Sequence, residues 1–185
     1  AIDKNTLRPD LIASLFSDQF GLANQPYINI EIPGQIFAVN YDIGNQGISY
    51  YDTEYKQVSS DENQNTGNSG WSYRNDGVDI ESCSDPTIDY NIGWIETGEW
   101  LEYTVTITQP GTYTTKAIIA SNGSGKMRIK VNGKQIGSDM KIPDTGGNQN
   151  WGQVNFGQQS FSAGEALVRV EILEGEFSFA MITVD

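Results

Sequence analysis

Residues 100–108 read WLEYTVTIT, and this stretch decides the fold. Its apolar residues alternate with polar ones, which is the period of a strand with one buried face. A Pro-Gly pair at 110–111 predicts a turn, and the run at 113–119 predicts a second strand. The residues expected on the buried face of the first strand are Leu101, Tyr103, Val105 and Ile107.

The same signals continue to the C-terminus. Apolar residues alternate with basic ones at 127–131, and Asn132-Gly133 is a strong signal for a two-residue hairpin. Further strands are predicted at 151–156, 166–173 and 177–184. About nine or ten strands in total are the number expected of two packed sheets. We therefore predict an all-β protein, a two-sheet β-sandwich or jelly roll over residues 34–185.

The first 33 residues differ from the rest. Residues 7–20 have helix-compatible spacing, and residues 27–32 alternate like a half-buried strand that ends at Pro33. We predict that residues 1–33 form an N-terminal arm, or the remnant of a linker, that packs on the sandwich. The polar stretch at 55–72 has no apolar rhythm and predicts a long surface loop.

The charge of the chain excludes several classes of partner. The formal net charge is -13, and the 11 Lys and Arg residues are scattered rather than clustered. Phosphate backbones need clustered cations, so we expect no nucleic-acid partner. The same charge repels acidic polymers and favours a neutral ligand. No apolar run approaches the length of a membrane span. We also expect the protein to be a monomer.

The missing residue types exclude further chemistry. Histidine is absent, which removes Ser-His and Cys-His nucleophilic catalysis and His-ligated zinc. Cys83 is the single cysteine, so no internal disulfide is possible. Its acidic neighbours favour a structural role over a reactive thiol.

Two tryptophans are candidates for ligand binding. Sugar rings present flat C–H patches that stack on aromatic faces, while their hydroxyls need planar polar partners. Trp151 follows a polar, glycine-rich loop that ends in Asn150, and Trp94 follows Asn91. We predict that both indoles face solvent and grip a sugar. Trp100 lies inside a strand and is interpreted as a packing residue, while Trp71 is compatible with either core cover or a second surface site.

Paired carboxylates are the remaining candidates for catalysis. Asp79 and Glu81 lie on one strand face, where two carboxylates would suit glycoside hydrolysis. We favour a solvated face or a ligand contact instead. A sandwich of this size offers little room for the deep cleft that raises a carboxyl pKa into the working range. No catalytic residue is predicted.

Five short motifs occur in a characteristic order: PGQIFAVNYD at 33–42, YRNDGVDIE at 73–81, NIGWI with GEWLEY at 91–103, PGTY at 110–113, and PDTGG at 143–147 leading to Trp151. In this order the chain resembles the family 6 carbohydrate-binding modules of bacterial polysaccharide hydrolases. The resemblance implies a galactose-binding-domain-like jelly roll with a ligand cleft at its loop edge. It also implies that Trp94 and Trp151 grip one sugar ring, with Asn91 as a neighbouring hydrogen-bonding residue.

The chain departs from this family where a structural calcium is usually held. Phe37 and Val39 replace the two Glu of the opening strand, and Ala180 replaces the Asn near the last strand. Because calcium needs several oxygen ligands, we expect the ion to be absent or displaced, and no cofactor to be required. Ser178 is the residue left to take over the role of the missing sugar-binding amide.

These observations predict non-catalytic binding of a neutral polysaccharide or oligosaccharide, such as a β-1,3-glucan, an agarose-like galactan or a related β-glycan. We expect a covalently linked catalytic domain that the module targets to its substrate, and a bacterial extracellular or cell-surface location. One alternative is a protein-interaction module with a decayed sugar cleft, and a second is a small glycoside hydrolase or lyase. The predicted contact residues are Trp94, Trp151, Asn91, Asn150, Asp79, Glu81 and Ser178.

Overall fold

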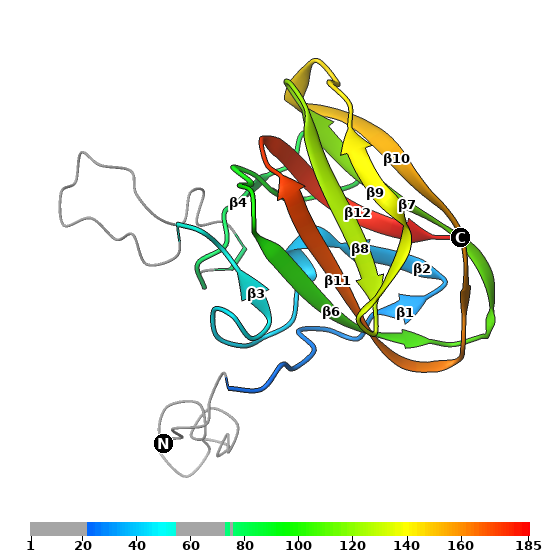
Figure 1. The fold of residues 1–185 in the computed structure, drawn as a ribbon. Helices are drawn as coiled ribbons and strands as arrows, with labels where there is room; N and C mark the ends of the chain where they lie inside the picture. Colours follow the sequence, from blue (N-terminus) through cyan, green and yellow to red (C-terminus); the bar gives the residue numbers. More distant parts are fainter. Residues whose placement is uncertain (1–21, 55–72, 75) are drawn as a thin grey trace, which may run out of the picture.

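The computed structural model describes residues 22–54, 73–74 and 76–185, and these form two β-sheets packed face to face (Figure 1). Within them there is no α-helix, and the single 3₁₀ helix is Ala38–Asn40. The predicted all-β sandwich is therefore confirmed. No helix of the described residues is long and apolar enough to cross a membrane. The helix expected at 7–20, the loop expected at 55–72 and Trp71 lie outside the described residues.

Six strands form each sheet. The first sheet has the order β1-β6-β11-β8-β9, with β3 also paired to β6. The second has the order β10-β7-β12-β5-β4, with β2 also paired to β12. The strands of the first sheet are β1 (Glu31–Ile32), β3 (Tyr50–Tyr51), β6 (Trp100–Ile107), β8 (Gly125–Val131), β9 (Lys134–Ile142) and β11 (Gly164–Glu174). Those of the second are β2 (Gly34–Phe37), β4 (Ile80–Ser82), β5 (Tyr90–Ile92), β7 (Gly111–Ser121), β10 (Gly147–Phe161) and β12 (Phe177–Val184).

The predicted buried face of β6 is confirmed, because the four residues expected on it, Leu101, Tyr103, Val105 and Ile107, are all buried. The predicted hairpin between β8 and β9 is also confirmed. Val131 pairs with Lys134, and the two residues between them both have positive φ, 50° at Asn132 and 76° at Gly133. A two-residue turn with two left-handed positions matches the twist of the strands, and Asn-Gly adopts it at little cost.

The described part of the N-terminal segment lies against the first sheet. Ile30 and Ile32 are buried, and β1 runs parallel to β6 with Glu31 opposite Thr106. Gln25 forms an isolated bridge with Ile43. The apolar face seen in the sequence at 27–32 is thus used to extend the core at the edge of the sheet.

An irregularity in β10 shapes the loop edge of the sandwich. Gly147 pairs with Ser121 and Trp151 with Ala120, so three residues of β10 lie between two adjacent residues of β7. These three, at 148–150, bulge out of the ladder and their side chains leave the regular alternation. The bulge brings the side-chain amide of Gln149 to Glu81 on β4 and Asn91 on β5.

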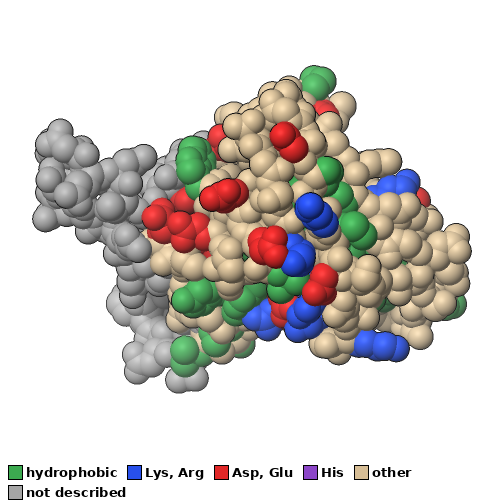
Figure 2. Space-filling view, turned by 45° about the horizontal axis from the view of Figure 1, so that its top comes forward, with side chains coloured by type: hydrophobic (Ala, Val, Ile, Leu, Met, Phe, Trp, Pro, Cys, Tyr) green, Lys and Arg blue, Asp and Glu red, His purple; other side chains and the backbone are tan. Residues whose placement is uncertain are grey.

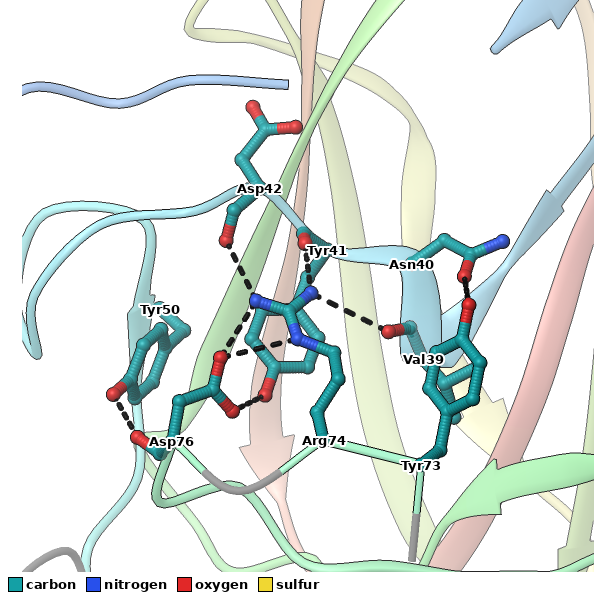
Figure 3. A network of polar contacts seen from close by, with 8 residues as sticks. All are labelled: Val39, Asn40, Tyr41, Asp42, Tyr50, Tyr73, Arg74 and Asp76. Atoms are coloured by element: carbon teal, nitrogen blue, oxygen red, sulfur yellow. Dashed lines mark hydrogen bonds and ion pairs between the residues drawn. The ribbon is translucent and has the colours of Figure 1, made fainter. Parts of the chain in front are cut away.

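A buried arginine ties the segment after β2 to the segment before β4 (Figure 3). Arg74 donates to the backbone carbonyls of Val39, Tyr41 and Asp42 and forms an ion pair with Asp76 at 2.6 Å. Its guanidinium lies 3.6 Å from the ring centre of Tyr41, whose hydroxyl donates to the same Asp76 carboxylate. The planar guanidinium of Arg74 thus contacts three carbonyls, one carboxylate and one aromatic ring at once. It therefore holds together two segments that are far apart in the sequence.

Candidate functional site

A cavity of about 560 Å³ lies at the loop edge of the sandwich. It is formed by the loops that follow β3, β5, β7 and β11, together with β4, the bulge of β10 and the start of β12. Its polar lining consists of three amides, four carboxylates and one hydroxyl, and one indole contributes the large apolar surface. These residues are Asn122, Asn148, Gln149, Glu54, Glu81, Glu96, Glu176, Ser178 and Trp94.

Trp94 projects from a loop that is fixed on both sides. Its side chain is 54% exposed, whereas the next residue, Ile95, is buried in the core. The carbonyl of Ile95 accepts a hydrogen bond of 2.8 Å from the backbone N–H of Glu176. Trp94 itself has φ 46°, a left-handed conformation that a bulky residue rarely adopts. The fold therefore holds a large apolar ring in water at the cavity wall, where strain is tolerated because the flanking contacts impose it.

Glu81 is held at the cavity wall by two amides. Its Oε1 accepts hydrogen bonds from Asn91 at 3.1 Å and from Gln149 at 2.7 Å. Gln149 also donates to the Oδ1 of Asn91 at 3.1 Å, which closes a triangle of three side chains. Gly93 makes this possible, because a Cβ at that position would lie 2.9 Å from Glu81 Oε1. The carboxylate is therefore positioned before any ligand arrives.

Trp151 takes part in the next layer of this network. Its indole N–H donates to Ser84 Oγ at 3.1 Å, and the same Oγ donates to the Gln149 carbonyl at 2.8 Å. The backbone N–H of Ser84 donates to Gln149 Oε1 at 2.8 Å. Trp151 thus supports the bulge residue that contacts Glu81.

Ser178 is the one lining residue with a nearly buried side chain and a free hydroxyl. It is 2% exposed, it lies on β12, and it lines the cavity. The described residues offer its hydroxyl no hydrogen-bond partner. The hydroxyl oxygen is not among the fully buried atoms either, so it is available to a ligand or to water.

Three of the seven predicted contact residues line the cavity, and the other four do not. Trp94, Glu81 and Ser178 line the cavity. The other four residues, Asn91, Asp79, Asn150 and Trp151, are not part of its lining.

Two of these four residues, Asn91 and Asp79, were predicted to contact the ligand directly, but both are buried. Asn91 is fully buried behind Glu81, and its amide groups are used by Glu81, Gln149 and the Ile92 carbonyl. Asp79 is also buried, 4% exposed. The reason is the packing of the β10 bulge over this part of β4 and β5, which a strand pattern does not reveal. Asn150 is exposed but donates to the carbonyl of Gly146, within its own turn.

Six polar lining residues were not predicted from the sequence. A signal existed for Asn148 and Gln149, which precede Asn150 in the same polar loop, and for Glu96, which follows Trp94 closely. None existed for Glu54, Asn122 or Glu176, because each lies in a different loop. Their meeting is a consequence of the sheet order.

A buried carboxyl lies beside the cavity and joins two of its walls. Glu99 Oε1 accepts from the backbone N–H of Thr53 at 3.1 Å, and Oε2 accepts from that of Glu96 at 3.0 Å. Burial, and secondarily the negative charge of Asp52, raise the pKa of Glu99 to about 7. Its protonation state therefore changes near neutral pH.

The residues at the expected calcium positions do not fit that ion. Phe37 is half-buried and Val39 and Ala180 are buried, and none has a side-chain oxygen. The carbonyl of Val39 faces the guanidinium of Arg74 at 3.4 Å. Among the described residues, no three His, Cys, Asp or Glu side chains are grouped as metal ligands. Calcium takes oxygen ligands, usually with several carboxylates among them.

Comparisons with known proteins agree with this geometry. Residues 74–184 match a family model described as "Carbohydrate binding module (family 35)". The solved structures that are similar include the C-terminal family 6 module of a marine laminarinase from Zobellia galactanivorans, with 26% identity, 58% of this chain and 86% of that chain covered, and a TM-score of 0.52. They also include the family 6 module of Cellvibrio mixtus lichenase 5A in complex with cellotriose. This match has 27% identity, covers 61% of this chain and 89% of that chain, and has a TM-score of 0.52.

A third similar structure supports the fold alone. It is a β-1,3-glucan-binding family 6 module from Bacillus halodurans, with 20% identity, 85% of this chain and 98% of that chain covered, and a TM-score of 0.57. No curated protein sequence matches this chain. The family model is that of family 35, whereas the three solved structures belong to family 6, the family that the sequence motifs resemble.

Proposed function

We propose that this chain, which belongs to the carbohydrate-binding modules described by the family 35 model, holds a non-acidic glycan by stacking one sugar ring on Trp94. The observation that carries the proposal is the 54% exposed indole on the wall of a 560 Å³ cavity. The axial C–H groups of a pyranose form a flat patch that an indole face covers. Amides and a fixed carboxylate beside it suit the ring hydroxyls.

The neutral β-glycans are the first ligands to test. The similar module from the Zobellia laminarinase and the cellotriose complex of the Cellvibrio module both favour β-linked glucans. We propose β-1,3-glucan, agarose-like galactan or a related β-glycan. One or two rings held at an open edge correspond to dissociation constants on the order of 10 μM to 1 mM.

The module itself carries out no reaction in this proposal. The module raises the effective concentration of a linked glycoside hydrolase at its substrate, because the enzyme stays near the polymer that the module holds. We propose an extracellular or cell-surface setting for the same reason, because polysaccharides of this kind lie outside the cell. A family 6 assignment is proposed on the motifs at 91–103 and on the similar solved structures.

Replacing Trp94 with alanine tests the proposal. We expect the affinity for laminari- or cello-oligosaccharides to fall roughly tenfold, because the stacking surface is removed. Isothermal titration calorimetry gives the affinity, and circular dichroism checks the fold. Trp100→Phe is the control, because Trp100 does not line the cavity. It lies on β6 in the first sheet, and its ring centre is 3.6 Å from the guanidinium carbon of Arg169. Equal affinity of wild type and Trp94→Ala would place the sugar elsewhere.

Trp151 is proposed to act as a positioning residue through its N–H. Trp151→Phe keeps an aromatic ring but removes the hydrogen bond to Ser84, worth about 1 kcal/mol. We expect the affinity to fall about fivefold and the exchange of the Gln149 side-chain amide, followed by NMR, to become faster. If Trp151 instead forms the second wall of a sugar clamp, Trp151→Phe binds like wild type and only Trp151→Ala loses affinity.

A further inference from the structure

Among the described residues, the charged side chains that line the cavity are all acidic. They are four Glu residues, and no described Lys or Arg lies beside them in the lining. A second, smaller hollow beside it is lined by Glu96, Glu174 and Glu176, of which Glu174 is paired with Lys126. Figure 2 shows acidic side chains gathered on the side of the molecule nearest the grey segments, with the basic side chains farther across the face. Carboxylates around a concave surface focus a negative potential into it.

These four carboxylates are not neutralised by the described part of the chain. None of Glu54, Glu81, Glu96 and Glu176 forms an ion pair with a described Lys or Arg. On the first sheet, Lys126 is paired with Glu174 and Arg128 with Asp139. Within the described part of the chain, the charge in the cavity is therefore left for a ligand to balance.

Two acceptors in the cavity are fixed and open. Oε1 of Glu81 is held by two amides, while Oε2 makes no hydrogen bond with the described residues. The hydroxyl of Ser178, on a side chain that is 98% buried, lines the same cavity without a protein partner. Ser178 is an observation independent of the carboxylates, and it shows that the cavity floor is built to meet a polar ligand.

The arrangement suits an ammonium group better than a metal ion. No three of the acidic side chains in the described chain converge as metal ligands do. An ammonium has three donors and one charge, so it is satisfied by one carboxylate oxygen, one hydroxyl and water. Its hydrogen bonds to a carboxylate are charge-assisted and stronger than those of a neutral hydroxyl.

We infer that the preferred ligand is a glycan with a free amino group, a 2-amino-2-deoxy sugar whose ring lies on Trp94 and whose ammonium faces Glu81 and the cavity carboxylates. This inference rests on the proposed function, because it needs a ring on Trp94. It narrows the class of sugar at that site. The N-acetylated sugar loses the charge, and a uronic acid is repelled.

The test compares three oligomers of the same length and linkage: the β-1,4-linked tetramers of glucosamine, N-acetylglucosamine and glucose. Titrations are made at about pH 6, where carboxylates and amines are both charged. We expect the glucosamine tetramer to bind about tenfold more tightly than the glucose tetramer. The ratio of the two affinities should fall in Glu81→Gln and in Glu176→Gln. Glu165→Gln is the matched control, because Glu165 is exposed at the β11 start, away from the cavity lining.

General attraction of a polycation to an acidic chain is the rival explanation. It predicts that Trp94→Ala keeps the glucosamine affinity and that Glu165→Gln lowers it as much as Glu81→Gln does, and either result overturns the inference. Equal affinity for the amine and glucose tetramers overturns it too, while leaving the proposed function intact. If none of the tetramers binds and neither do laminari-oligosaccharides, the proposed function fails together with the inference.

Discussion

Arg74→Ala is expected to lower the free energy of unfolding by about 3–5 kcal/mol. The Arg74 side chain is 6% exposed, and its removal leaves the Asp76 carboxylate and three backbone carbonyls without their cation. Two aromatic contacts are lost as well, with the ring centres of Tyr41 and Tyr27 at 3.6 and 4.4 Å. The cost arises mainly from the buried side, because the carbonyls behind Arg74 lose their donor, while Asp76, whose side chain is 34% exposed, loses its ion pair. Urea unfolding followed by fluorescence measures the change.

Two further variants make this result specific to the network. Arg74→Lys keeps the charge but has no planar fork to reach several carbonyls at once, so we expect an intermediate loss. Arg128→Ala removes an exposed arginine that pairs with Asp139, and we expect a much smaller change. An unfolding free energy for Arg74→Ala within about 0.5 kcal/mol of wild type would show that the network does not hold the two segments together.

The free energy of unfolding is expected to fall by about 3 kcal/mol, through Glu99 alone, as the pH rises from about 4.5 to about 7. Burial raises the pKa of this carboxyl, so in that window the folded state holds a proton that the unfolded state has lost. The contribution is present in full below the ordinary pKa and is lost as the pH passes the folded value. Burial also raises the pKa of Glu102, which adds in the same direction.

Glu99→Gln isolates this contribution. It cannot titrate, so the pH dependence of unfolding should be shallower in the variant than in wild type between those limits. Hydrogen bonds lower the pKa of Asp85 and Asp139 below the ordinary value, so their contribution to stability changes at lower pH and not between those limits. Glu165→Gln serves as the control. Parallel curves for wild type and Glu99→Gln would mean that Glu99 stays ionised when the protein folds.

The candidate site was only partly visible in the sequence. Trp94 could be found because a tryptophan in a polar, glycine-containing loop has no strand pattern to bury it. Glu81 and Ser178 were found through motifs at positions that the fold does bring to one cavity. Asn91 was placed in contact with the ligand because its motif is next to Trp94, yet the structure puts it behind Glu81. Neighbours in the sequence can point to opposite sides of a strand, so proximity along the chain does not decide contact.

By itself, the sequence determined the fold class, most of the strands and the hairpin turn, because alternation and turn chemistry are local properties read over a few residues. From the formal net charge of -13 it also predicted a ligand that is not an anion. Only the tertiary structure decided which carboxylates meet. Glu54, Glu81, Glu96 and Glu176 come from four separate parts of the chain, and sheet order together with the β10 bulge brings them around Trp94. Such long-range contacts depend on which strands become neighbours, and no local pattern carries that information.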